Sequence, residues 1–169
     1  MIIFSIPHLK EENVDYRPFD EDKDIFLLYN WTAKDKEWLD EELIPEESSA
    51  EDFERLIEKY RSEKGEWLVW QQEGMDVGIT FFLPSAESNG QPWIGTVIVN
   101  PEYRRAGYGK EIIRHITHLV KQNKVIFAAN PFAFDDWHRF LGTAGFEQYK
   151  IEKDESGREY LLFVLPIDT

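Results

Sequence analysis

The segment 97–110 contains the residue types and the spacing of an anion-binding site. Its sequence, VIVNPEYRRAGYGK, is an apolar run followed by a turn with Gly107 and Gly109, after which a helix is expected to begin. Glycines let a backbone approach a phosphate closely, and the N–H groups at the start of a helix point together at the positive end of the helix dipole. Arg104, Arg105 and the final lysine add positive charge. The segment therefore predicts a phosphate-binding loop.

Two familiar phosphate-binding patterns are excluded. A nucleotide P-loop needs a glycine five positions before its Gly-Lys pair and Ser or Thr after it, but Arg104 and Glu111 occupy these positions. The dinucleotide fingerprint needs a third glycine three residues after Gly109, where Ile112 stands. No acidic residue at the end of a second strand completes that fingerprint either. The loop must therefore belong to another class of phosphate site.

The pattern that remains is Arg104-x-x-Gly107-x-Gly109, preceded by Val99-x-Pro101. It resembles motif A of the GNAT superfamily of N-acetyltransferases, in which Gln or Arg, two residues, Gly, one residue, and Gly or Ala follow a hydrophobic strand. An ordinary strand, turn and helix could carry the same short pattern. The order of the surrounding elements has to decide between the two interpretations.

Hydrophobic periodicity predicts one order of elements. Strands are expected where apolar residues form short or alternating runs, and helices where they recur every three or four positions. Ser48 and Glu51 have the spacing of a capping box at the start of a helix. We expect a strand at 14–19, helices beginning near 20, 35 and 48, strands at 67–71, 77–83 and 93–99, a helix after the glycine turn, a strand at 125–129, a helix around 137–144 and a closing hairpin at 146–165.

That order is the one the GNAT fold would require. The resemblance implies an α/β (α+β) fold with a mixed, mostly antiparallel sheet of about six to seven strands, flanked by helices, whose central parallel strands splay apart. It extends from Tyr16-Arg17-Pro18, which looks like the family's first strand, to Gly145-Phe146, which looks like its final helix-to-strand junction. Residues 1–10 lie outside the match. The activity implied is transfer of the acetyl group of acetyl-CoA to a primary amine by direct attack in a ternary complex.

Composition narrows the class of protein. The chain has 169 residues, 42% of them hydrophobic, and no cysteine, which favours one domain over residues 1–169 without disulfides or a thiol nucleophile. Its first residues lack a basic leader and a span long enough for a membrane, so we expect a cytoplasmic protein without membrane contact. The net charge of −14 argues against nucleic acid as the main partner. We expect a monomer or a homodimer.

The charge is unevenly distributed. Residues 101–124 contain six basic and two acidic residues, a balance of +4, whereas residues 11–60 contain eighteen acidic and six basic residues, a balance of −12. The first region suits a polyanion and the second a cation. A merely solvated acidic surface remains the alternative for the second region.

The resemblance also implies where acetyl-CoA would be held. The backbone of the strand before the turn would pair with the pantetheine amides, the turn and the following lysine would hold the pyrophosphate, and Asn130 would contact the pantetheine arm. Asn130 could instead only complete the turn before Pro131. The implied residues are Val97, Ile98, Val99, Arg104, Arg105, Ala106, Gly107, Tyr108, Gly109, Lys110 and Asn130.

The catalytic groups are not marked in the same way. Aligning 140–146 with the family's Phe-Tyr-x-Lys-x-Gly-Phe places Leu141 where a tyrosine general acid often lies, and Gly95 and Thr96 stand where the fourth strand often carries glutamate. A CoA thiol with a pKa of about 8 to 9, by analogy with cysteine, can leave without full protonation, so activity is not excluded. The candidate catalytic residues are Tyr103, Tyr108, Glu41 and His138, alongside Glu37, Glu42, Asp135 and Asp136.

The acidic early helices suggest the acceptor. In this fold they would wall the acceptor site, so Glu37 and Glu41 could attract a cationic small-molecule or peptide amine, with Trp31 and Trp38 as cation-π faces. Tryptophans at such positions are more often core residues, which is the alternative for both. No metal is expected, because the only His pair at helical spacing, 115 and 118, lacks a third ligand. An acyl-CoA-binding sensor or scaffold without turnover remains the alternative function.

Overall fold

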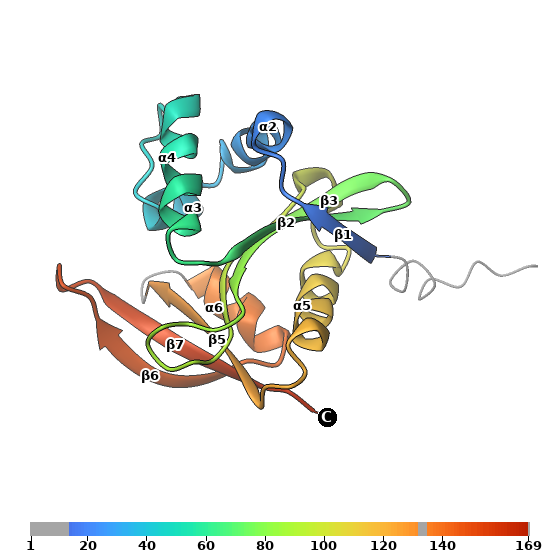
Figure 1. Ribbon diagram of the computed structural model, residues 1–169. Coiled ribbons are helices and arrows are strands. Elements are labelled where there is room, and N and C mark those ends of the chain that lie inside the picture. Colours follow the sequence, from blue (N-terminus) through green and yellow to red (C-terminus); the bar gives the residue numbers. More distant parts are fainter. Residues whose placement is uncertain (1–13, 132–134, 169) are drawn as a thin grey trace, which may run out of the picture.

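A computed structural model describes residues 14–131 and 135–168 of the chain. Its centre is a sheet of seven strands in the order β1-β2-β3-β4-β5-β7-β6 (Figure 1). Every neighbouring pair is antiparallel except β4 and β5, which are parallel. The strands are β1 Val14–Pro18, β2 Glu66–Gln72, β3 Met75–Leu83, β4 Trp93–Val99, β5 Val125–Pro131, β6 Glu147–Lys153 and β7 Glu159–Pro166. The expected fold class is confirmed.

Helices cover both faces of the sheet (Figure 1). The two faces follow from the alternation of side chains along each strand: in β4, Val97 packs into the cluster around α5 and α6, whereas Ile98 packs into the cluster under α2, α3 and α4. The helices are α2 Glu21–Thr32, α3 Lys36–Glu41, α4 Ala50–Arg61, α5 Tyr108–Leu119 and α6 Asp135–Thr143, with a short 3-10 turn, η1, at Pro101–Tyr103.

Local sequence explains where these helices begin. The helix α5 follows Gly107, which adopts a left-handed backbone (φ 87°) that other residues tolerate poorly, and its Ile112 and Ile116 are fully buried. The expected capping box at Ser48 and Glu51 was one residue too early. The carboxylate of Asp52 instead accepts the backbone N–H of Ser49 at 2.9 Å.

The parallel pair β4 and β5 separates after two residue positions. Trp93 pairs with Phe127 and Ile94 with Ala128, but no later pair joins the two described strands, although β4 runs to Val99 and remains paired with β3 to that end. Beyond Ala128, β5 is paired only with β7. The expected splay of the central strands is confirmed, and it leaves two backbone edges facing each other across an opening.

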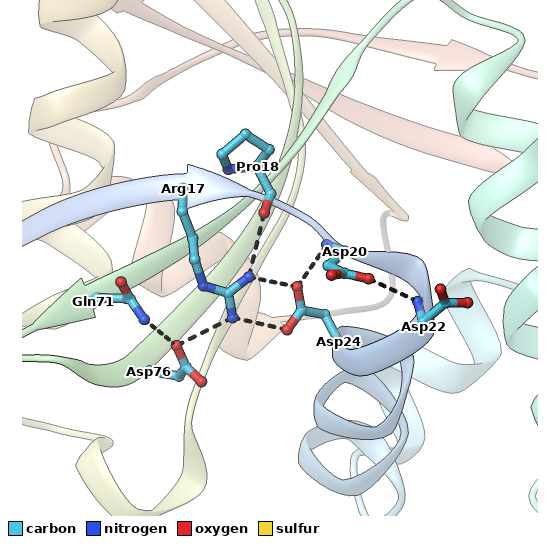
Figure 2. Close-up of polar contacts among 7 residues, drawn as sticks. All are labelled: Arg17, Pro18, Asp20, Asp22, Asp24, Gln71 and Asp76. Atoms are coloured by element: carbon cyan, nitrogen blue, oxygen red, sulfur yellow. Dashed lines mark hydrogen bonds and ion pairs between the residues drawn. The ribbon is translucent and has the colours of Figure 1, made fainter.

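An ion-pair network fixes the first strand to the first described helix (Figure 2). The guanidinium of Arg17 donates to both oxygens of Asp24, at 2.7 and 2.8 Å, and also contacts Asp76 at 3.4 Å. Asp24 is 1% exposed and also accepts the backbone N–H of Asp20 at 2.7 Å. Burial raises the pKa of the Asp24 carboxyl, but the hydrogen bonds from Arg17 and Asp20 and the charge of Arg17 outweigh it and lower the pKa overall. The network therefore holds α2 against the sheet.

Across the two described ranges, no helix has both the length and the apolar character that a membrane span requires.

Candidate functional site

A cavity of about 580 Å³ includes the open edge of β4. The turn before α5, the helix α3 and the helix α6 each contribute part of its wall. Its described lining residues are Asp35, Glu37, Trp38, Glu41, Gly95, Thr96, Val97, Ile98, Val99, Tyr103, Arg104, Arg105, Gly107, Tyr108, Gly109, Lys110, Asn130, Trp137 and Phe140.

The turn before α5 has the geometry of an anion cradle. Arg105 and Gly107 both adopt left-handed backbones, with φ of 63° and 87°, which is the kind of conformation that turns successive N–H groups into a concavity. An added Cβ at Gly107 would meet no atom within 4 Å, so the space over the loop is open. The first N–H groups of α5 have no carbonyl partner within the helix. This loop fits a phosphate group.

Charged side chains surround the same turn. Lys110 and Arg105 are exposed at its rim. Arg104 lies between the turn and the helical wall: its guanidinium is 3.5 Å from the carbonyl of Trp31 and 3.9 Å from the Asp35 carboxylate. The positive charge predicted for this loop is therefore divided between the cavity rim and a contact with the acidic wall.

Gly109 permits a close approach between α5 and α6. A Cβ at this position would lie 2.8 Å from two ring atoms of Phe140 and 3.6 Å from Val99. The Phe140 ring stacks on Trp137 at 5.0 Å, and both rings line the cavity. Glycine at 109 thus keeps the aromatic wall in place next to the open strand edge.

The helix α3 is fixed against β4 by a buried hydrogen bond. The indole Nε1 of Trp38 donates to Thr96 Oγ1 at 2.9 Å, and the indole stacks on Phe53 at 6.2 Å. Asp35 begins the helix by accepting the Trp38 backbone N–H at 3.1 Å. Trp38 and Glu41 are one helical turn apart, so the face that carries Trp38 also brings Glu41 to the cavity.

Two carboxyl groups of this wall have raised pKa values. Burial, and then the negative charge of Glu42, raise the pKa of Glu41 to about 8, although Arg158 opposes the rise. Glu37 is more exposed, and its pKa is raised by partial burial and then by the charges of Asp136 and Asp35. The part of the cavity lined by α3 is therefore an electronegative wall in which added negative charge is unfavourable and a cation is favourable.

Comparison with known proteins agrees with this geometry. A sequence model described as the Acetyltransferase (GNAT) family matches residues 13–146. The Bacillus subtilis (strain 168) protein YkzC, which is uncharacterized, is 40% identical over 123 residues, or 72% of this chain and 87% of YkzC. The chain belongs to the GNAT acetyltransferase family. The expected family and enzyme class are confirmed, and GNAT enzymes use acetyl-CoA as the acetyl donor.

Solved structures share the GNAT fold at low sequence identity. An acetyltransferase from Thermus thermophilus has a TM-score of 0.71 and 14% identity, covering 91% of this chain and 97% of its own. AAC(6')-Ib, solved in complex with ribostamycin and coenzyme A, has a TM-score of 0.72 and 15% identity, covering 91% and 93%. A chimeric spermidine N-acetyltransferase SpeG from Vibrio cholerae has a TM-score of 0.69 and 12% identity, covering 91% and 95%.

The sequence-predicted residues do not all reach the cavity. Most of the cofactor residues implied by the GNAT resemblance line it, including the fully buried Asn130, but Ala106 does not. Trp38 lines it, whereas Trp31 is buried in the cluster under α2, α3 and α4 and offers no ring face to the cavity. His138 is also outside the lining, with its Nε2 3.1 Å from the carbonyl of Pro131.

The two tyrosine candidates line the cavity but direct their hydroxyl groups elsewhere. The hydroxyl of Tyr108 hydrogen-bonds to Gln72, and that of Tyr103 lies 3.6 Å from the sulfur of Met75. Burial, and then the partial charge of Tyr103, raise the pKa of Tyr108, so it ionises less readily than an ordinary tyrosine. Neither arrangement aims a proton donor at the open edge of β4.

The two departures from the GNAT pattern have structural causes. Leu141 is fully buried in the core of α5 and α6, so this helix presents its neighbour Phe140, and not position 141, to the cavity. A Cβ at Gly95 would lie 2.7 Å from the ring of Phe81, so that ring fills the space a strand glutamate would need.

Sequence reasoning missed five cavity residues, which are Asp35, Gly95, Thr96, Trp137 and Phe140. Asp35 and Thr96 are recognisable only from their contacts with Trp38. The contact between Trp38 and Thr96 joins positions far apart in the chain. The i, i+3 spacing of Trp137 and Phe140 on α6 was a usable signal. Within the part of the chain that the structure describes, no group of three or more His, Cys, Asp or Glu side chains could hold a metal ion.

Proposed function

We propose that this GNAT acetyltransferase, as a single domain over residues 1–169, transfers the acetyl group of acetyl-CoA to a primary amine of a cationic small molecule or peptide. The observation that carries the proposal is one cavity that is lined both by the cationic glycine turn and by the acidic face of α3. A polyanionic donor and a cationic acceptor would each find a complementary charge in this cavity. Their reacting atoms would then meet beside β4, as direct attack in a ternary complex requires.

The donor end would use mainly backbone groups. In the proposal, the turn from Arg105 to Gly109 receives the pyrophosphate, with Lys110 adding charge at the exposed rim. The open edge of β4 at 97–99 offers backbone groups that are not paired with β5. Pantetheine amides are suited to such an edge because a buried backbone N–H or carbonyl needs a hydrogen-bond partner. Asn130, on the facing strand, would bind the pantetheine arm.

The acceptor end would use the charge of α3. Glu37 and Glu41 line the cavity there, and Trp38 lies between them on the same helix. An amine that carries a second positive charge would be attracted to this wall before the reacting nitrogen is in place. Neighbours of similar fold were solved with ribostamycin bound or are named as spermidine N-acetyltransferases, which is consistent with a cationic amine. The proposal involves no nucleic acid partner and no membrane.

Two measurements test the proposal. Calorimetry should detect acetyl-CoA binding, and release of the CoA thiol should then be followed over a panel of amines: a polyamine, an aminoglycoside, a lysine peptide, a neutral amino sugar and an anionic amino acid. We expect the highest kcat/KM for the cations, and we expect it to fall as salt is added. Preference for the neutral or anionic amines would contradict the proposed acceptor class.

A matched pair of variants separates local charge from net charge. Glu37→Gln removes one charge from the cavity wall and should raise KM for cationic amines about 3-fold to 10-fold, equivalent to ~1 kcal/mol. Glu54→Gln removes the same charge from an exposed position on α4 outside the cavity and should leave KM unchanged. Equal effects of the two changes would show that only the overall charge of the protein matters.

A specific observation favours a second candidate function, that of an acyl-CoA-binding sensor. The positions that often supply the GNAT acid and base are a buried leucine at 141 and Gly95, whose space is filled by Phe81. A sensor would bind acetyl-CoA tightly but release no thiol with any amine in the panel. Turnover with any of these amines would exclude it.

A further inference from the structure

We propose that Glu41 is the group that accepts the proton of the acceptor ammonium, and that Arg158 is a positioning residue that governs when Glu41 can do so. This inference rests on the proposed function, because it concerns the acceptor end of the same cavity. It moves the base from β4, where the GNAT resemblance implies it, to the helix that faces β4.

Geometry places Glu41 in the cavity that contains the open edge of β4. The hydrogen bond from Trp38 to Thr96 joins α3 to β4, and Glu41 follows Trp38 by one turn on the same face. Glu41, Thr96 and Val97 line one cavity. A carboxylate in this position shares the cavity with the strand along which the acetyl thioester would extend.

The other described acidic groups of the cavity are less suited to the task. Asp35 is engaged as the helix cap, where it accepts the Trp38 N–H at 3.1 Å, and it also faces Arg104. The hydroxyl groups of Tyr103 and Tyr108 are directed at Met75 and Gln72. Glu37 is exposed to solvent near the start of α3. Glu41 combines partial burial with a place in the cavity lining one helical turn after Trp38, whose indole donates to Thr96.

The surroundings of Glu41 give it a high proton affinity. Burial is the largest cause, and the negative charge of Glu42 is the next, with smaller contributions from Asp35 and Glu37, so its pKa is about 8. An alkylammonium has a pKa of about 10.4, and an ordinary carboxylate would be a weak base toward it. A carboxylate whose pKa is raised to about 8 remains largely ionised above that pH and is a stronger proton acceptor.

Arg158, near the start of β7, opposes this rise. Its guanidinium is 3.2 Å from Asp40, the neighbour of Glu41, and 5.8 Å from the centre of the Tyr160 ring. Its positive charge lowers the pKa of Glu41. The remaining groups that face Glu41 electrostatically are the phenols of Tyr160 and of Tyr60 on α4. Arg158 is therefore the cation, supplied by the closing hairpin, that limits the rise in the pKa of Glu41.

Glu41 takes one proton from the ammonium, and the freed nitrogen lone pair forms a bond to the acetyl carbon. The carbon–sulfur bond breaks, and its electron pair leaves on the CoA sulfur. The nitrogen then loses a second proton. Of the two protons released, one protonates the CoA thiolate, and the other passes from Glu41 to water. The products are an amide, CoA thiol and one proton.

The first test compares Glu41→Gln with Glu37→Gln, which removes the same charge from the same helix. In the wild type, kcat/KM for the acceptor should form a bell whose acid limb is near pH 8, the pKa of Glu41. Glu41→Gln should lose that limb and fall about 100-fold at neutral pH, with recovery at high pH as free amine becomes available. Glu37→Gln should raise KM and keep the limb. An unchanged acid limb in Glu41→Gln would overturn the assignment.

The second test concerns Arg158. Arg158→Gln should move the acid limb of the pH profile to a higher pH than in the wild type. Arg158→Lys should return the limb to its wild-type pH, because only the positive charge is needed. Arg55→Gln, at an exposed arginine on α4 outside the cavity lining, is the matched control and should leave the limb in place. A limb that Arg158→Gln does not move would overturn the role given to Arg158.

The outcomes also separate this inference from the proposed function. Wild-type turnover that persists at full rate in Glu41→Gln would remove Glu41 as the base and leave the N-acetyltransferase proposal intact. Absence of thiol release by the wild type with every amine, despite tight acetyl-CoA binding, would remove both. Each result can be distinguished within one set of assays.

Discussion

Gly109 provides the sharpest test of how the fold forms the donor end of the cavity. The change Gly109→Ala adds one methyl group 2.8 Å from Cε2 and Cζ of Phe140. Carbon atoms normally approach to about 3.5 Å or more, so the ring has to move by about 0.7 Å or more. Because Phe140 lines the cavity and stacks on Trp137, its displacement alters the wall beside the pantetheine path.

The expected magnitudes follow from opposing effects. Alanine stabilises a helix by about 1 kcal/mol relative to glycine, whereas overpacking costs ~1–3 kcal/mol. The net loss in the free energy of unfolding should therefore be at most about 2 kcal/mol. The protein stays folded, and acetyl-CoA affinity should fall about 10-fold, or ~1.4 kcal/mol, because the ligand must compete with the shifted ring.

Calorimetric titration with acetyl-CoA and urea unfolding measure the two quantities separately. Gly142→Ala on α6 is the matched control: a Cβ there meets no atom within 4 Å, so it should preserve affinity and not destabilise the fold. Adding Phe140→Leu to Gly109→Ala should recover part of the affinity by removing the displaced ring. Wild-type affinity in Gly109→Ala would refute the reasoning, since the added methyl group would then leave the donor site unaltered.

Three further predictions concern stability and the donor site. Arg17→Met should lower the free energy of unfolding at pH 7 by about 2–3 kcal/mol, less than for a fully buried pair because a third of the Arg17 side chain is exposed. The pKa of Asp24 is lower in the folded protein than in the unfolded chain, so the stabilisation by this ion pair should be fully present above the unfolded-state pKa. It should disappear as the pH falls through the folded-state pKa. The free energies of unfolding in urea of the wild type and the variant should therefore converge in acid. Tyr60→Phe removes the hydroxyl that donates to both oxygens of buried Glu42 at 2.7 Å. The change should lower the free energy of unfolding, measured in urea at neutral pH, by about 1.5–3 kcal/mol. The loss should be smaller in acid, because burial raises the pKa of Glu42 and the carboxyl is then protonated. Lys110→Gln should weaken acetyl-CoA binding about 3-fold to 10-fold and reduce its dependence on salt, and unchanged salt dependence in calorimetry would contradict a role for this lysine at the pyrophosphate.

The sequence predicted the glycine turn and the helix that follows it because the signals for both are local. Gly107 and Gly109 mark a backbone conformation and a close approach that few other residues permit, and the apolar stripe of α5 follows from its own spacing. The order of strands and helices follows from the same short-range periodicity. These features identified the family and the fold before any contact between distant residues was known.

The acceptor half depended on contacts that join distant parts of the chain. Nothing in the local sequence separates Trp31 from Trp38, yet one is a core residue and the other lines the cavity, because only Trp38 meets Thr96 on β4. Similarly, Phe140 and not Leu141 faces the cavity, as decided by how α6 packs on the sheet.

The sequence by itself thus determined the glycine turn, the order of strands and helices along the chain and the acidic character of the first helices. Only the tertiary structure decided which acid of α3 is partly buried in the cavity wall and which cation lowers its pKa. The physical reason is that a pKa depends on desolvation and on charges brought close in space, and Glu41 and Arg158 become neighbours only when the closing hairpin packs near α3.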